Sequence, residues 1–143
     1  MKFKFFIDKD RPEEVIVYAK EKTWLVEAIE QLVEDDSAQL TGYKESEVKT
    51  LKLSEIYCFT VEDNRLFALT KTEKWRLKSR LNQIEEKMSD SFIKINKSCI
   101  VSINKIEKFD AAISGALMVV LKNGYSDYVS RRNIKNLKER LGI

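Results

Sequence analysis

The stretch Lys122–Asn133, with the sequence KNGYSDYVSRRN, is the one around which the rest of the chain is organised. A run of β-forming residues, Leu117–Leu121, leads into its Asn-Gly step, the dipeptide that most favours a type I′ hairpin turn. A second short extended run then ends on two successive arginines. The pattern predicts a β-hairpin over residues 117–129, followed directly by a basic helix.

That last helix is expected to run from Arg132 to Leu141, because apolar residues recur there at helical spacing. Ile134, Leu137 and Leu141 share one face, which we expect to pack inward. Ser130 stands where an N-cap residue would, just before the helix. The helix is therefore interpreted as a buttress, with recognition left to the turn in front of it.

Composition excludes most enzyme classes. The chain has 143 residues, 43% of them hydrophobic, which fits one domain with a real core and a small appendage. It has no histidine, so the usual partner of a serine or cysteine nucleophile is missing, as is the commonest metal ligand. Its four glycines form no phosphate-binding motif. We expect no enzyme activity, no cofactor, no metal and no small-molecule substrate, and we expect Cys58 and Cys99 to be buried free thiols.

Charge is distributed unevenly along the chain. Residues 1–38 carry six basic and ten acidic side chains, a net −4, whereas residues 39–143 carry twenty and thirteen, a net +7. This asymmetry favours a body that meets a polyanion, although an ordinary charged surface would look similar. The first residues hold no apolar signal core, so a cytoplasmic location is the expectation.

Residues 1–38 are expected to form a small β-β-α unit. Alternation predicts strands over residues 2–8 and 14–19, and Thr23 could N-cap a helix from Trp24 to about Asp36. The helix has an acidic outer face. The unit is interpreted as a dimerisation or regulatory docking segment, with a simple extension of the core as the alternative.

Residues 39–143 are expected to form a mainly β domain of packed antiparallel sheets with short helices. Strand patterns recur about every ten residues, which is typical of antiparallel rather than parallel sheets. After a connector at 37–43, strands are predicted at 47–53, 56–61, 66–70, 74–77, 91–101 and 103–109, with a short helix at 79–88.

Three polar clusters interrupt these apolar β segments. They are Glu62-Asp63-Asn64-Arg65 at a hairpin turn, Lys94 with Asn96-Lys97-Ser98 inside a strand, and Ser130-Arg131-Arg132-Asn133 before the last helix. Arg and Lys can bind phosphates or guanine edges, and Asn can read adenine with two hydrogen bonds. Taken singly, each cluster is more typical of an exposed turn or a helix cap, but three on one scaffold favour a nucleic-acid surface.

The segment Phe92–Ile106 resembles the signature segment of the LytTR DNA-binding domain family. The tail from Leu121 through Asn123-Gly124 to Arg131-Arg132 is similar to that family's closing hairpin, and Ile56–Phe59 is similar to its first strand. The resemblance covers about residues 40–143. It implies a mainly β fold in which loops, not a recognition helix, reach into successive major grooves of a bent duplex.

Carried over by position, the resemblance assigns base contacts and phosphate contacts to different residues. Base-reading positions fall on Asn64, on Asn96-Lys97 and on Arg132, with Arg65 and Ser130 beside them. The phosphate-side candidates are Lys94, Ser98, Arg131 and Lys135. The roles of Arg131 and Arg132 could be reversed. Asn96 replaces the family's usual His and Lys94 its usual Arg, which should alter sequence preference more than fold.

The resemblance implies a bacterial, homodimeric transcriptional regulator that binds double-stranded DNA. Thirty-eight residues cannot hold a receiver domain, so the chain looks like the stand-alone subgroup, whose members are often paired with a small multi-pass membrane protein. The alternative is a protein-interaction module that grips its partner with the acidic helix at 23–36 and does not bind DNA.

Overall fold

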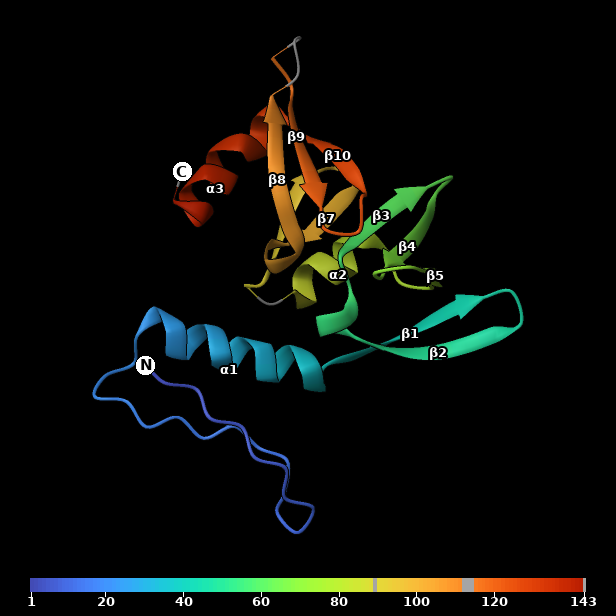
Figure 1. The fold of residues 1–143 in the computed structure, drawn as a ribbon. Coiled ribbons are helices and arrows are strands. Elements are labelled where there is room, and N and C mark those ends of the chain that lie inside the picture. The colour runs from blue at the N-terminus through green and yellow to red at the C-terminus, as the bar shows by residue number, and fades with distance from the viewer. Residues whose placement is uncertain (89, 112–114, 143) are drawn as a thin grey trace.

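The computed structural model describes residues 1–88, 90–111 and 115–142. Most of the regular structure in these residues is antiparallel strand, which confirms the predicted fold class (Figure 1). The elements are α1 (Trp24–Ser37), β1 (Gln39–Lys44), β2 (Glu47–Lys52), β3 (Cys58–Glu62), β4 (Arg65–Leu69), β5 (Lys74–Leu77), α2 (Leu81–Lys87), β6 (Phe92–Asn96), β7 (Cys99–Ser102), β8 (Ile106–Ala111), β9 (Leu117–Leu121), β10 (Ser126–Val129) and α3 (Arg131–Leu141). Short 3-10 turns stand at Leu53–Glu55 and Ile103–Lys105.

The strands form two sheets. A seven-stranded sheet has the order β2-β1-β5-β4-β3-β7-β6, and a three-stranded sheet has the order β10-β9-β8. Every pairing is antiparallel. β3 ends at Glu62 and β7 begins at Cys99, yet the two strands are neighbours, so chain segments far apart in sequence meet within the large sheet.

Each face of the large sheet has its own core. The first core, on what we call the first face, surrounds Phe59 and Trp75 and includes Leu81 and Ile84 of α2. The second core lies on the opposite or second face, under the small sheet and α3, where Leu137 is fully buried. The inward packing predicted for the last helix is confirmed, since Ile134 and Leu141 are also partly buried against this second core.

Both cysteines belong to the second core. Cys58 on β3 and Cys99 on β7 are free and fully buried, as predicted. A hydrogen bond with the Cys58 thiol and burial both raise the pKa of the Cys99 thiol, so it stays protonated at neutral pH. Both thiols are therefore part of the packing, and Cys99 is held in its unreactive form.

The N-terminal segment differs from its prediction. The helix is confirmed, with α1 starting at Trp24 and Thr23 at the N-cap position, but the two strands expected at 2–8 and 14–19 are wrong. The segment turns at Asp8–Arg11 and runs without sheet pairing, away from the body on the far side of α1 (Figure 1). Alternation predicts strands, yet a strand also needs a hydrogen-bonded neighbour, and these residues have none within the described chain.

α1 itself is anchored to the body by a buried carboxylate. Asp35 is 5% exposed, and its two oxygens accept hydrogen bonds from Gln31 Nε2 at 3.0 Å and Ser91 Oγ at 2.6 Å. Lys52 adds an ion pair to Asp36 at 3.4 Å. The helix is thus fixed beside the start of β6. None of the helices in the described residues is long and apolar enough to cross a membrane.

Most of the remaining strands and the short helix were predicted at nearly their observed bounds. The single strand expected at 91–101 is wrong, because the chain forms the antiparallel pair β6 and β7, so the polar cluster predicted inside a strand lies at a hairpin turn. The strand expected at 103–109 begins only at Ile106, after a 3-10 turn. The connector expected at 37–43 is also wrong. That segment forms β1, which pairs with β2 over six residue pairs. Gln39–Lys44 mixes polar and small residues and lacks a clear apolar alternation, so its strand character comes from the partner rather than from its own sequence.

Turn geometry also differs from the prediction. Asn123-Gly124 was expected to form a type I′ turn, but only Gly124 has a positive φ, of 88°. Gly124 N donates to Leu121 O at 2.9 Å, which makes a three-residue loop closed by a left-handed glycine. The turn with two left-handed residues occurs instead at Asp63 and Asn64, with φ of 50° and 61°.

Gly42 on β1 is required by close packing. A Cβ added there would lie 2.8 Å from Leu51 Cδ1 and 2.8 Å from Trp75 Cβ. Trp75 is 2% exposed and its Cβ is fixed by the backbone of β5, so it cannot move aside. The strand can lie against the first core only because this position has no side chain.

We predict that Gly42→Ala lowers the free energy of unfolding by about 1–3 kcal/mol, because the added methyl group overpacks the core. Urea denaturation measures the change. Thr41→Ala on the exposed side of the same strand is the matched control, and its effect should stay within about 0.5 kcal/mol. Equal stability of the two variants would show that β1 can shift without cost.

Candidate nucleic-acid interface

The structure brings the three polar clusters, apart from Lys94, to one region of the second face. Ser98 O accepts a hydrogen bond from Val61 N at 2.9 Å, which joins the β6–β7 turn to the end of β3. Ile95 O accepts one from Ser130 N at 2.9 Å, which joins the same turn region to the start of α3. Segments that lie far apart in the sequence are therefore fixed to one another by backbone hydrogen bonds.

Asn96 holds this junction together from inside. Its side chain is 1% exposed, its Nδ2 donates to Tyr128 O at 2.9 Å, and its Oδ1 accepts from Ser98 N at 2.8 Å. Both polar atoms of the amide are occupied within the protein. This conflicts with the base-reading role expected for Asn96, because a buried amide with satisfied hydrogen bonds cannot meet a base edge in this conformation. Its observed role is to shape the turn.

Lys97 is the exposed residue of that turn. It follows Asn96 directly, at the point where the β6–β7 pairing ends, and its side chain faces solvent. Ser98 beside it is half-buried. Of the residues predicted in this cluster, Lys97 is therefore the one placed to reach a ligand, and Ser98 can contribute at its edge.

Asn64 and Arg65 occupy the end of the β3–β4 hairpin. Both are exposed, and the left-handed backbone at Asp63 and Asn64 makes the turn tight. Figure 1 shows this hairpin projecting from the body of the molecule. A narrow projecting hairpin with an amide and a guanidinium at its end can enter a groove of a duplex.

Lys94 is not brought to the same place. Its neighbours Ile93 and Ile95 belong to the second core, so Lys94 points to the opposite face of the sheet. There its Nζ forms an ion pair with Glu85 Oε2 of α2 at 3.1 Å. The phosphate role expected for Lys94 conflicts with this position, since the ammonium is neutralised on the face away from α3.

The β10–α3 junction presents the predicted basic residues to solvent. Arg131, Arg132 and Lys135 are exposed, and within the described residues no carboxylate pairs with them. Ser130 stands at the N-cap position, as predicted, but its Oγ accepts from Asn133 Nδ2 at 2.6 Å and does not cap the helix backbone.

Two basic residues of α3, Lys138 and Arg140, were not among the predicted site residues. A shallow groove along the helix is lined by Arg131, Lys135 and also Lys138, which the spacing i, i+4, i+7 could have indicated. Arg140 instead turns inward, donating to Phe92 O at 2.9 Å and to Asp90 O. It clamps α3 to the start of β6.

A polar contact between the two sheets was not predicted either. Thr60 Oγ1 on β3 and Tyr125 OH lie 3.1 Å apart, and Tyr125 OH donates to Asp127 Oδ2 at 3.4 Å. Burial raises the pKa of Tyr125 well above its ordinary value, so the hydroxyl stays neutral. Asn123 Nδ2 also donates to Thr70 O at 3.1 Å. These bonds fix the small sheet, and with it the β10–α3 junction, on the large one.

Known proteins resemble this chain along its whole length. Residues 46–142 match the LytTr DNA-binding domain family. Two HTH-type transcriptional regulators of Staphylococcus aureus, from strains bovine RF122 and NCTC 8325, are each 34% identical over 146 residues, covering 100% of this chain and 99% of the relative. The LytTr DNA-binding domain of a Bacillus cereus response regulator shares the fold, with a TM-score of 0.69 at 19% identity over 75% of this chain and 99% of that one. In the described residues strands separate every pair of α-helices, so no helix-turn-helix is formed.

Proposed function

We propose how this chain, which belongs to the LytTR family of DNA-binding domains and is a transcriptional regulator, recognises its DNA. Its regulatory activity is binding and not catalysis. The proposal is that the three clustered turns read the major groove of double-stranded DNA while the strands and helices behind them serve as a rigid support.

The observation that carries the proposal is the hydrogen-bonded convergence of the turns. Val61, Ile95 and Ser98 use their backbones to hold three exposed basic or amide-bearing tips at fixed separations. Fixed separations allow several base contacts at once without the entropy cost of ordering loops on binding.

Within this surface we assign different roles to different side chains. Arg132, Lys97 and Asn64 are proposed to contact base edges, with Arg65 beside Asn64. Arg131, Lys135 and Lys138 on the exposed side of α3 are proposed to contact phosphates, and Ser98 and Ser130 to lie at the edge of the interface. Asn96 is proposed to support the β6–β7 turn from within the protein. Lys94, which pairs with Glu85 on the other face, is proposed to have no part in the DNA contact.

The assembly is also a proposal. Residues 3–18 expose several large apolar side chains, among them Phe3 at 90% and Tyr18 at 92%. Large exposed apolar patches mark sites of interaction with a protein or a membrane. We propose that the chain forms a homodimer in the bacterial cytoplasm. A small multi-pass membrane protein is the candidate regulator. The same exposed surface favours a second function, protein interaction through residues 1–38.

Selection of bound duplexes from a genomic library tests the proposal, because it works on an operator of any sequence. We expect recovered sequences to share a motif repeated at intervals of about one helical turn. Affinity for the recovered duplex should fall steeply with salt as phosphate counterions are released. Recovery of no common sequence by the folded protein at low salt would favour the protein-interaction function.

On a recovered duplex, Arg132→Ala is predicted to weaken specific binding by about 1–3 kcal/mol and to relax the preference at one base position. A guanidinium bonded to a base edge provides both affinity and discrimination, so both should be lost together. Arg11→Ala, an exposed arginine in the N-terminal segment, is the matched control. Fluorescence titration with single-base variants of the duplex measures both quantities, and unchanged base preference would remove Arg132 from the reading set.

A further inference from the structure

We propose that the open face of β4 and β5 binds the phosphate backbone of the duplex beside the sequence that the turns read. Arg65, Arg76 and Lys78 are the residues assigned to this second basic surface, which we call the flank surface. The inference rests on the proposed function, because it adds a contact to the same DNA and not a new ligand.

The register of the strands places these cations on one face. Phe67 on β4 pairs with Arg76 on β5, and Leu66 pairs with Leu77, so Arg65 and Lys78 are the next positions across from each other. Arg76 also pairs with Tyr43 of β1, and Lys78 Nζ lies 4.5 Å from the centre of the Tyr43 ring. Because paired residues share a face, the three cations point the same way.

This face is the part of the large sheet that the second core leaves open. On β3 the same face carries Cys58 and Thr60, which are covered by the small sheet. On β4 the cover ends at Leu69, which packs against the second core, and beyond it Arg65, Arg76 and Lys78 are exposed. Like charges at neighbouring cross-strand positions, as at Arg65 and Lys78, destabilise a sheet, and a bound anion would relieve that repulsion.

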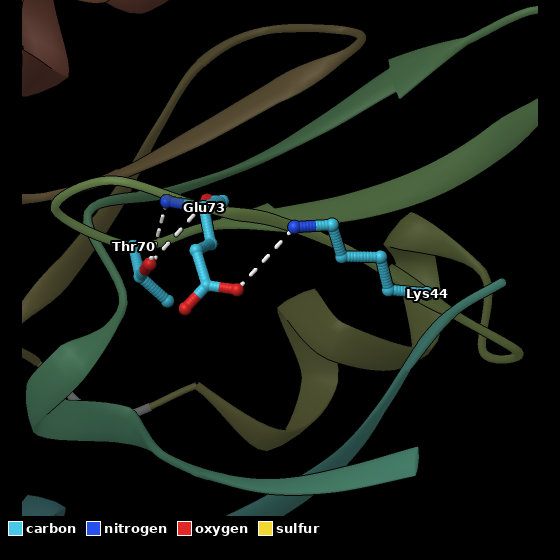
Figure 2. A network of polar contacts seen from close by, with 3 residues as sticks. All are labelled: Lys44, Thr70 and Glu73. Atoms are coloured by element: carbon cyan, nitrogen blue, oxygen red, sulfur yellow. Dashed lines mark hydrogen bonds and ion pairs between the residues drawn. The ribbon is translucent and has the colours of Figure 1, made fainter. Parts of the chain in front are cut away.

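Nearby carboxylates do not neutralise the group. Glu62 pairs with Lys74, and Glu73 pairs with Lys44 at 3.4 Å while its backbone N–H donates to Thr70 Oγ1 at 3.1 Å (Figure 2). Within the described residues, Arg65, Arg76 and Lys78 have no carboxylate partner. Their charges remain available to an external anion.

The position of the flank surface indicates which anion it meets. Arg65 belongs both to this surface and to the β3–β4 hairpin end that is proposed to enter the groove, so the two surfaces are continuous. Along β5 the cations alternate with buried residues, which spaces Arg76 and Lys78 about 7 Å apart, a spacing similar to that of successive phosphates. The Tyr43 ring supports the extended side chain of Lys78, and the Phe67 ring supports that of Lys74 on β5. A continuous duplex leaving the hairpin end would run along this row.

The test compares salt dependence on two duplexes that contain the selected sequence. One carries ten additional base pairs on each side, and the other is trimmed to the sequence itself. For Arg76→Gln/Lys78→Gln, we expect the slope of log affinity against log salt to shrink by about 1.8 on the long duplex, two phosphates at roughly 0.9 each. On the trimmed duplex the variant and the parent protein should have equal slopes.

Two further variants of this chain serve as controls. Lys49→Gln/Lys87→Gln removes the same charge from exposed positions on the first face and should keep the parent slope on both duplexes. Arg76→Lys/Lys78→Arg keeps the charge and should also keep the slope, which separates charge from folding. An unchanged slope for Arg76→Gln/Lys78→Gln on the long duplex overturns the inference, as does an equal loss on the trimmed one. If the parent protein selects no sequence at all, it is the proposed function that fails.

Discussion

Leu137→Ala is expected to lower the free energy of unfolding by about 2–5 kcal/mol, the range for removing a fully buried leucine from a core. Leu137 is the one residue of α3 with no exposed surface in the described structure, and it lies among Ile95, Val129 and the rest of the second core. The cavity cannot collapse easily, because Arg140 fixes the helix to the carbonyl oxygen of Phe92.

Urea denaturation followed by circular dichroism measures this loss. Asn136→Ala, at the exposed position just before it, is the control and should change stability by less than about 0.5 kcal/mol. The same variant is also expected to bind DNA more weakly. At temperatures where it remains folded, DNA affinity should fall, because α3 carries Arg131 and Lys135. A large stability loss with unchanged affinity would show that the β10–α3 turn keeps its position without the helix.

Most strands and helices of residues 39–143 could be predicted because the spacing of apolar residues differs between strands and helices. The alternation through Lys74–Leu77 produces a strand with Trp75 and Leu77 buried, as observed. Helical spacing in the last segment identified Leu137 as a core residue. By contrast, residues 2–8 alternate equally well and form no strand, because pairing depends on a neighbouring strand that the local sequence does not encode.

The site was predictable in its composition but not in its geometry. Arg131 and Arg132 stand out by type and by position before a helix, and both are exposed as expected. Asn96 was assigned to base reading by its position in the resemblance, and its burial with both amide atoms bonded conflicts with that role. Its burial follows from a bond to Tyr128 O, 32 residues away, which no local pattern can reveal. The side chains behind a binding surface have the same chemistry as those on it, so only the fold separates them.

Asn96→Ala is expected to reduce DNA affinity although Asn96 is buried. The substitution leaves Tyr128 O and Ser98 N without their side-chain partner, at a cost of about 1–3 kcal/mol for each group that stays unsatisfied. The turn that presents Lys97 should then lose its fixed position. Denaturation measures the first effect and titration with the selected duplex the second. Lys94→Ala, on the same strand but facing α2, is the control and should leave affinity nearly unchanged.

A double-mutant cycle with Lys97 separates positioning from direct contact. If Asn96 acts by holding the turn, Asn96→Ala should weaken binding strongly in the parent protein and little once Lys97→Ala has removed the side chain that the turn presents. If Asn96 leaves the core and reads a base itself, the two losses should add, and the base preference of the Lys97→Ala protein should change again when Asn96 is replaced. The buried amide with both atoms bonded favours the first result, in which a residue with almost none of its surface exposed determines affinity through the backbone of its neighbour.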